Sequence, residues 1–212
     1  MLVQDVMQTE LLTITPETTL PEAIKLVQRR GVRHLPVVEG QTLVGIVSDR
    51  DLKRAMPSGA TSLSAQELNY LLDRVQVGEF MTRTVITVAP IFPVEEAARL
   101  MVSEKISALP VTDGERLVGI VTETDVLALF ARAMGALEPS SRLDVVMDDQ
   151  PGALGRVVQA VEGSGAVISS IMTLETPSGV KEAVIRIATI NPRQAIRALE
   201  AGGYTVRQPW RG

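Results

Sequence analysis

The sequence has 212 residues, of which 45% are hydrophobic, and a formal net charge of −4 with a pI near 5.2. The acidic balance argues against a general nucleic-acid binder, which needs a basic face, and the lack of cysteine excludes disulfides and cysteine metal sites. No apolar run approaches the roughly 20 residues that cross a bilayer. The first ten residues carry Asp5 and Glu10 instead of a basic signal-peptide start. We therefore expect a cytoplasmic protein without a membrane segment.

A long internal repeat organises the first 126 residues. Shifting the sequence by 74 positions aligns residues 5–52 with 79–126 without a gap, and one third of the aligned positions are identical. The identical pairs include Met7/Met81, Thr13/Thr87, Pro16/Pro90, Pro36/Pro110, Gly45/Gly119 and Asp51/Asp125. A repeat of this length predicts two copies of one supersecondary unit.

Each copy predicts the same order of elements. An extended run, LLTIT or VITV, is followed by a helix, which in the first copy begins with a capping box of Thr19 and Glu22 and ends at Gly31. In the second copy Pro93 starts this helix. Two β runs separated by an acidic-glycine turn come next, and a further helix follows them. The order is β-α-β-β-α, and two such units are expected to pack as one module.

The rest of the chain predicts a connecting helix, a boundary and a third unit. The apolar positions of residues 61–78 have helical spacing, and the proline and serines of 135–141 mark a boundary. Residues 142–212 predict the order β-α-β-β-α-β, a ferredoxin-like antiparallel sheet with helices on one face. The expected fold is α/β (α+β), with segments 1–60, 61–78, 79–134, 135–141 and 142–212.

The repeated phrases GIVSDRDL and GIVTETDV each end a strand and begin a helix. Ser48 precedes Asp51 by three residues, as Thr122 precedes Asp125. Such a terminus offers N–H groups and a hydroxyl to an anion, the carboxylate accepts two hydrogen bonds from a vicinal diol, and the glycine lets a flat ring approach. The alternative interpretation is an ordinary helix cap. The duplication favours a ligand site.

The two copies resemble cystathionine-β-synthase (CBS) domains, which occur in pairs as the Bateman module. The resemblance covers residues 1–134 and rests on VMQ…TITP, GVRHLPVV and GIVSDRDL, and on FMT…VITVAP, KISALPV and GIVTETDV. The connecting helix is similar to that of bacterial acetoin-utilisation regulatory proteins. The resemblance implies two clefts, related by pseudo-twofold symmetry, that bind adenosine compounds such as AMP, ADP, ATP or S-adenosylmethionine.

The resemblance also implies which residues hold the ligand. The aspartates would hold the ribose, and the hydroxyls three residues before them would reach the phosphate or ribose. The implied nucleotide-binding residues are Ser48, Asp51, Arg33, His34, Thr13, Thr122, Asp125, Thr87 and Ser107.

A basic pair distinguishes the two copies. Family members often place a basic residue before the proline of the strand, facing the phosphates. Arg33 and His34 stand there in the first copy, whereas Ser107 and Ala108 stand there in the second. The first-copy cleft is therefore expected to prefer phosphorylated ligands, and to bind them more tightly as the imidazole protonates below roughly pH 6.5. The alternative is that His34 is a loop residue with no ligand role.

Residues 142–208 resemble an ACT domain, a module that often binds amino acids. The motif is DQPGAL at 149–154, followed by a helix and by GAVISSI. In that family the loop after the first strand wraps a small ligand, often at an interface with the second strand of a neighbour. The positions carried over are Asp149, Pro151, Gly152, Ala153 and Leu154, with Ile168, Ser169 and Ser170 across the interface. The alternative is a turn that only starts a helix.

These features predict a non-catalytic regulatory sensor. One histidine, no cysteine, and no P-loop or dinucleotide fingerprint leave no nucleophile with its base. No metal or required cofactor is expected, only an adenine nucleotide as regulatory ligand, with an amino acid or small metabolite as a second ligand. The regulated protein is unknown, and acetoin or acetate metabolism is an association through resemblance. The alternatives are a structural oligomerisation module with vestigial sites and an unrecognised enzyme.

A homodimer or higher homo-oligomer is also expected. Both resembled families associate through their own copies, and Ile91 and Phe92 place two apolar residues just before a helix where the first copy has Glu17 and Thr18. The alternative is a hydrophobic staple onto the chain's own helix.

Overall fold

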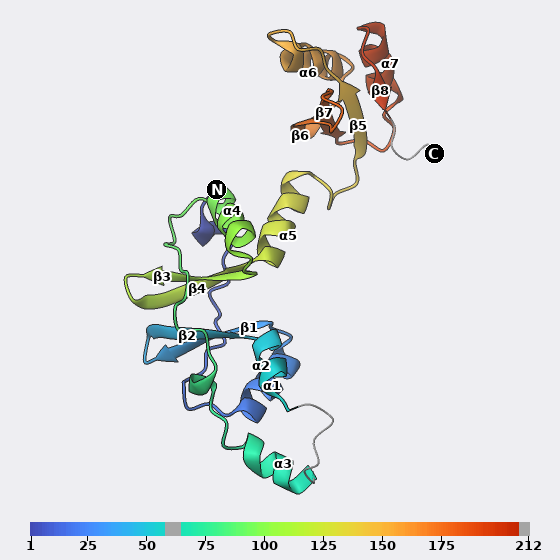
Figure 1. Ribbon diagram of the computed structural model, residues 1–212. Coiled ribbons are helices and arrows are strands. Elements are labelled where there is room, and N and C mark those ends of the chain that lie inside the picture. Colours follow the sequence, from blue (N-terminus) through green and yellow to red (C-terminus); the bar gives the residue numbers. More distant parts are fainter. Residues whose placement is uncertain (58–64, 208–212) are drawn as a thin grey trace. The chain divides into compact units, whose positions relative to one another are not determined.

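Two four-stranded sheets, one in each of two units, form the framework of the computed structural model (Figure 1). The structure describes residues 1–57 and 65–207, so the beginning of the predicted connecting helix and the last five residues lie outside it. The units comprise residues 1–126 and 127–212, and the division falls within one helix, α5 (Glu123–Ala133). Within residues 1–57 and 65–207, each helix is too short or too polar to span a lipid bilayer.

The first unit contains two similar sets of elements. The first set is η1 (Val3–Asp5), α1 (Leu20–Arg30), β1 (His34–Glu39), β2 (Thr42–Ser48), α2 (Asp49–Ala55) and α3 (Ala65–Leu72). The second set is η2 (Val77–Glu79), α4 (Val94–Glu104), β3 (Ala108–Asp113), β4 (Arg116–Thr122) and α5. The strand order is β1-β2-β4-β3, and a single pair, Thr42 with Arg116, joins the two hairpins.

The helix α1 has both ends that the sequence predicts, and α4 has the predicted beginning. Glu22 Oε2 accepts hydrogen bonds from the backbone N of Thr19 at 3.0 Å and from its Oγ1 at 2.9 Å, which forms the capping box of α1. Gly31 ends this helix in the left-handed conformation, with φ 66°. In the second set Pro93 is the N-cap of α4, but Lys105 ends the helix in the left-handed conformation, with φ 56°.

The predicted first strand of each repeat is wrong. LLTIT and VITV each form only one isolated parallel bridge, between Ile14 and Val37 and between Val88 and Val111. The rest of each run forms no ladder among the described residues. The segment just before each run pairs with the hairpin of the other repeat instead.

The first residues of each repeat pack against the other repeat. We call residues 2–8 and 76–82 the lead segments. In the first, the backbone N of Val3 donates to Phe92 O, and Gln8 and Ile120 exchange backbone hydrogen bonds of 2.8 and 3.0 Å. The second lead segment pairs in the same way with residues 16–18 and with Ile46. Its Val77 and Met81 complete the core of the first repeat, which includes Leu20, Leu35, Val37, Val47 and Leu52.

The repeated glycines make room for this exchange. A Cβ at Gly45 would lie 2.5 Å from Met81 Sδ, and one at Gly119 would lie 2.4 Å from Met7 Sδ. Both distances are too short for a real contact, so the two glycines admit the two lead segments. The interpretation of these glycines as places for a flat ligand ring is therefore corrected.

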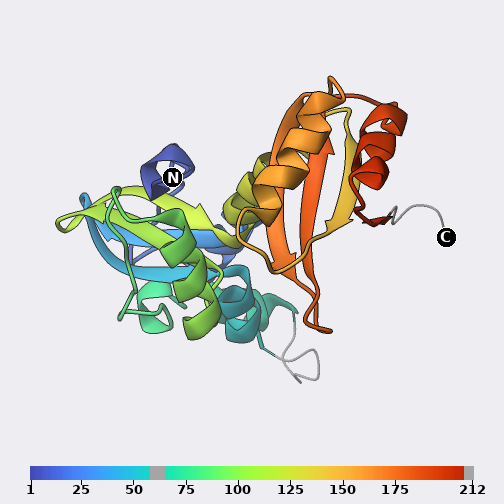
Figure 2. The same ribbon diagram turned by 90° about the horizontal axis from the view of Figure 1, so that it is seen from above.

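The second unit has the element order predicted from its sequence. Its elements are β5 (Ser141–Val146), α6 (Ala153–Gly163), β6 (Ile168–Glu175), β7 (Lys181–Ile187), α7 (Arg193–Ala201) and β8 (Val206–Arg207). The strands are antiparallel in the order β6-β7-β5-β8, the order of a ferredoxin-like sheet. Both helices pack on one face (Figure 2), over a core that includes Leu143, Ile185, Val157 and Leu199.

Candidate functional site

Two clefts in the first unit contain the repeated aspartates. The Asp125 cleft has a volume of about 360 Å³ and is lined by residues of both repeats, among them Gln8, Glu10, Leu11, Leu12, Gly31, Val32, Arg33, His34, Thr122, Thr124 and Asp125. The Asp51 cleft has a volume of about 210 Å³ and is lined by the equivalent positions, among them Thr82, Thr84, Val85, Ile86, Lys105, Ile106, Ser107, Ala108, Ser48, Arg50 and Asp51, together with His34. In each cleft, residues at the end of the second hairpin strand of one repeat therefore lie opposite residues that precede the first helix and the first hairpin strand of the other repeat.

Each aspartate is fixed by a reciprocal cap with the hydroxyl residue before it. Asp51 Oδ2 accepts from the backbone N of Ser48 at 2.9 Å and from its Oγ at 2.6 Å, while Asp51 N donates to Ser48 Oγ at 3.3 Å. Thr122 and Asp125 repeat the arrangement at 2.8, 2.7 and 3.4 Å. The helix-cap interpretation is therefore realised, and each hydroxyl hydrogen is already used. The cap also holds the carboxylate in one orientation in its cleft.

The second carboxylate oxygen differs between the two clefts. Asp125 Oδ1 accepts a hydrogen bond of 3.0 Å from Gln8 Nε2. At the equivalent of Gln8 the Asp51 cleft has Thr82, and Asp51 Oδ1 has no hydrogen-bond partner within residues 1–57 and 65–207. A carboxylate oxygen accepts about two hydrogen bonds, so Asp51 keeps both sites for a diol and Asp125 keeps one.

Arg33, the first residue of the basic pair, lies in the cleft of the other repeat's aspartate. Arg33 Nη2 donates to Thr124 Oγ1 at 2.8 Å, and both residues line the Asp125 cleft. The expectation that Arg33 serves the Asp51 cleft is therefore corrected. The reason is the exchange of lead segments, which brings the beginning of β1 beside the end of β4, and the sequence of one repeat does not contain this arrangement.

His34 lies between the clefts and lines both. Its Nε2 is 2.8 Å from Ser107 Oγ, so a hydrogen bond links the first residue of β1 to the residue just before β3 in the other repeat. Burial lowers the pKa of His34 below its ordinary 6.5, and the charge of Arg33 lowers it further. The imidazole is therefore neutral at physiological pH, and its protonation is displaced to lower pH than the sequence predicted.

The remaining predicted residues occupy different places. Ser107 lines the Asp51 cleft. Thr13 and Thr87 do not line either cleft, although their neighbours Leu12 and Ile86 do. Among the residues that sequence reasoning missed are Gln8, Arg50 and Lys105. At the equivalent positions the other repeat has Thr82, Thr124 and Gly31, but most aligned positions of the two repeats differ, so this difference alone does not identify the three residues.

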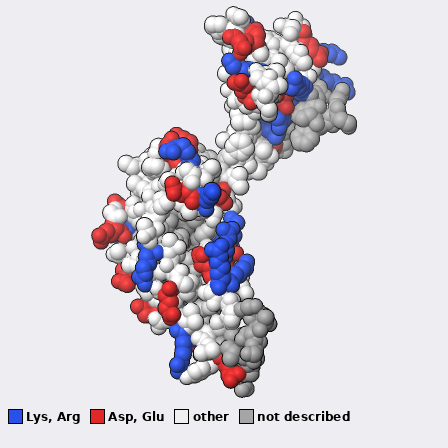
Figure 3. Space-filling model, in the orientation of Figure 1, with Lys and Arg blue, Asp and Glu red and all other residues white. Residues whose placement is uncertain are grey.

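Charges of both signs are interspersed over the face shown in Figure 3, and no continuous basic surface is visible among its described residues. Within the described ranges no group of three or more histidine, aspartate or glutamate side chains is placed to hold a metal ion.

The ACT-like residues fall at opposite ends of the second sheet. The loop at 149–152 follows the end of β5, where Val146 pairs with Glu182, whereas Ile168 pairs with Ile187 at the other end. One chain therefore does not bring the two predicted groups together. Asp149 forms an exposed ion pair of 2.8 Å with Lys181, and Gly152 adopts φ 80° as the N-cap of α6.

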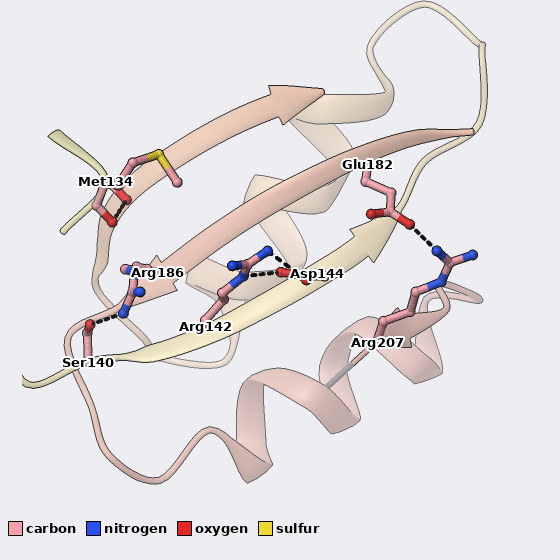
Figure 4. Close-up of polar contacts among 8 residues, drawn as sticks. Met134, Ser140, Arg142, Asp144, Glu182, Arg186 and Arg207 are labelled. Atoms are coloured by element: carbon pink, nitrogen blue, oxygen red, sulfur yellow. Dashed lines mark hydrogen bonds and ion pairs between the residues drawn. The ribbon is translucent and has the colours of Figure 1, made fainter. Parts of the chain in front are cut away.

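Polar side chains on the open face of this sheet were not predicted (Figure 4). Arg142 donates to both oxygens of the buried Asp144 at 2.7 and 3.0 Å, and Arg207 pairs with the buried Glu182. Arg186 Nη1 donates to Ser140 Oγ at 3.1 Å. The sequence signal for these polar residues is the two-residue alternation of a strand. Apolar residues of β5 and β7 point to the helices, so the residues between them face the other side of the sheet; the apolar residues are Leu143, Val145, Ala183 and Ile185. The two ion pairs satisfy the buried carboxylates of Asp144 and Glu182, whereas Arg186 keeps one buried nitrogen, Nε, without a hydrogen-bond partner among the described residues.

Comparison with known proteins relates the first unit to one family. Residues 3–58 and 77–132 each match the CBS domain. The crystal structure of a Vibrio cholerae protein named for acetoin utilization, AcuB, is 32% identical, with 66% of this chain and 98% of that chain covered and a TM-score of 0.53.

Two further solved structures contain adenosine ligands. The CBS domain pair of protein MJ0100, in complex with 5′-methylthioadenosine and S-adenosyl-L-methionine, is 31% identical over 62% of this chain and 97% of that one, with a TM-score of 0.52. CBSX2 of Arabidopsis thaliana, in complex with AMP, is 32% identical over 62% and 96% of the two chains, with a TM-score of 0.51. The duplicated sequence, the two equivalent clefts and these matches agree, and the chain belongs to the CBS domain family as a tandem pair followed by a second unit.

Proposed function

We propose that the protein is a non-catalytic sensor that binds adenosine compounds in its two clefts and acts on a separate polypeptide. The observation that carries the proposal is the repeated aspartate, held by its own cap with Oδ1 available in a cleft whose other walls include apolar side chains. A ribose diol would donate to that oxygen, and a base would lie against the apolar wall. The adenosine ligands of the CBS pairs named above support the assignment.

The two aspartates provide the test. The double variant Asp51→Asn with Asp125→Asn keeps the side-chain shape and an oxygen for the cap but removes the charge. In calorimetric titrations the unaltered chain is expected to bind adenosine, AMP or S-adenosylmethionine, and the variant is expected to lose this binding. Ligand at ~100 times its dissociation constant stabilises the folded state by about 2.7 kcal/mol per cleft, so a rise in melting temperature is expected only for the unaltered chain.

Asp113→Asn is the matched control, because this exposed aspartate is the last residue of β3 and lies outside both clefts. It is expected to bind as the unaltered chain does. Undiminished affinity in the double variant would refute the assignment. Release of phosphate from bound ATP would instead favour the enzyme alternative, and failure to bind any adenosine compound would favour a structural module.

For the second unit we propose an ACT domain that binds an amino acid or small metabolite between two copies of the chain. The β-α-β-β-α-β order and the strand order support the fold, and the separation of the two predicted residue groups within one chain supports a shared site. Titration with amino acids is expected to find one that binds and whose affinity falls in Asp149→Ala. This carboxylate is exposed and its ion pair contributes little stability, so unchanged affinity would refute its role.

The likeness to the Vibrio cholerae protein supports acetoin utilisation as the pathway of the regulated partner. Affinity purification of the full chain from its source, with and without added adenosine ligand, is expected to yield a ligand-dependent partner from that pathway.

A further inference from the structure

Lys105 has a backbone conformation that its side chain does not favour. It is the one residue other than glycine with positive φ in the described ranges, at φ 56° and ψ 40°. The equivalent position in the first repeat is Gly31, which ends α1 with φ 66°. In the left-handed region the Cβ of a non-glycine residue crowds the following carbonyl oxygen, so the backbone there is strained. Since glycine performs the same structural task in the other repeat, the fold does not explain a lysine here.

Lys105 and Arg50 both line the Asp51 cleft, from the end of α4 and the beginning of α2. Both are exposed, and neither forms a hydrogen bond or ion pair with any residue that the structure describes. Their equivalents in the Asp125 cleft, Gly31 and Thr124, are uncharged. Two unpaired cations therefore converge on one cleft from two elements.

The formal charges of the two clefts have opposite signs. In the Asp51 cleft Lys105 and Arg50 outweigh Asp51, which leaves a net charge of +1. In the Asp125 cleft Glu10 and Asp125 outweigh Arg33, whose guanidinium also donates to Thr124, and with His34 neutral the net charge is −1. A phosphate is attracted to the first cleft and repelled by the second.

Resting on the proposed function, we infer that the two clefts select different adenosine compounds. The Asp51 cleft takes a phosphorylated adenosine, with Lys105 and Arg50 as its phosphate-binding groups. The Asp125 cleft takes an adenosine compound without a phosphate. The strained lysine is the specificity-determining residue, and the fold gives up stability at the end of α4 to place its charge there. The protein would then report two different metabolites at once.

The test replaces the cations with the residues of the other repeat. In an Asp125→Asn background, which leaves the Asp51 cleft to be measured, Lys105→Gly with Arg50→Thr is expected to lower AMP affinity by about one to two factors of ten. Adenosine affinity is expected to change less than about threefold. Lys105→Gly alone is expected to raise the melting temperature, since it removes the left-handed lysine. The matched control is Arg54→Ala, which removes an exposed cation of α2, the helix of Arg50, but lies outside the cleft. This variant should leave AMP affinity unchanged.

Unchanged AMP affinity in the double replacement, or equal losses for AMP and adenosine, would overturn the inference while leaving the proposed function in place. A complete lack of binding by the unaltered chain would overturn both. In the complementary Asp51→Asn background, tighter binding of AMP than of adenosine to the Asp125 cleft would also overturn it.

Discussion

The single histidine, His34, lies at the contact between the two repeats. His34, at the beginning of β1, is hydrogen-bonded to Ser107, just before β3, and burial is the main reason for the lowered pKa of the histidine. Arg33 lowers the pKa further, and three nearby carboxylates oppose the shift without reversing it. These are Asp49, Glu123 and Asp51. Protonation therefore works against the folded state.

Stability is expected to fall on acidification because of this residue. The folded pKa is lower than the unfolded one, so between the two values the unfolded chain binds more protons and the free energy of unfolding rises with pH. The contribution is fully present above the unfolded pKa, near 6.5, and is lost as pH falls from there toward the folded pKa. His34→Gln keeps a polar side chain but does not titrate. Melting temperatures measured between about pH 7.5 and 5.5 should fall less steeply for this variant, and equal slopes would contradict the assignment.

At the scale of elements, the exchange of lead segments determines both the packing and the clefts. Met7 and Met81 each lie against a glycine of the other repeat. The same exchange places Gln8 beside Asp125 and Thr82 in the Asp51 cleft. The packing between the repeats and the walls of both clefts therefore depend on the same short segments.

Gly119→Ala tests this packing. Its Cβ would meet Met7 Sδ at 2.4 Å and Gln8 O at 3.3 Å, and overpacking of this kind costs about 1–3 kcal/mol. We expect a melting temperature several degrees lower. The control is Gly155→Ala, a helical glycine whose added Cβ meets nothing within 4 Å, which should stabilise slightly. Equal effects of the two substitutions would show that the methionine moves aside at no cost, and Met7→Ala combined with Gly119→Ala should recover part of the loss.

Most individual elements were predictable because their signals are local. The Thr19 cap, the Gly31 stop and the alternation in the second unit each lie within a few residues of what they determine. Two predictions were wrong for the same reason: that Arg33 serves the Asp51 cleft, and that the first extended run of each repeat is a strand. Pairing between segments far apart in the chain, here Gln8 with Ile120, has no local pattern.

At the scale of the whole molecule, apolar surface supports association between copies. Ile91 is 71% exposed at the turn before α4. Phe92 is half-buried, so part of this apolar pair remains accessible at the surface. We keep the homodimer as a prediction, with Ile91 in its interface.

Sedimentation velocity at micromolar concentration checks this prediction. The unaltered chain should sediment as a dimer or larger species. Ile91→Glu gives the second repeat the residue that the first repeat has at position 17, where it is tolerated. A charge buried without a partner opposes association, so this variant should shift toward monomer with an unchanged circular dichroism spectrum. A monomeric unaltered chain would refute the dimer, and an unshifted variant would exclude Ile91 from the interface.

The exchange also means that the unit of duplication is not the unit of folding. A polypeptide with a single copy of the repeat would carry a lead segment that fits another copy, and would lack the one that completes its own core. Two such polypeptides would complete each other by swapping these segments, as an intertwined pair. In the present chain the fusion of two copies makes that swap intramolecular. Substitutions or truncation within the first eight residues would therefore disturb the packing and pairing of β4, more than a hundred positions further along the sequence.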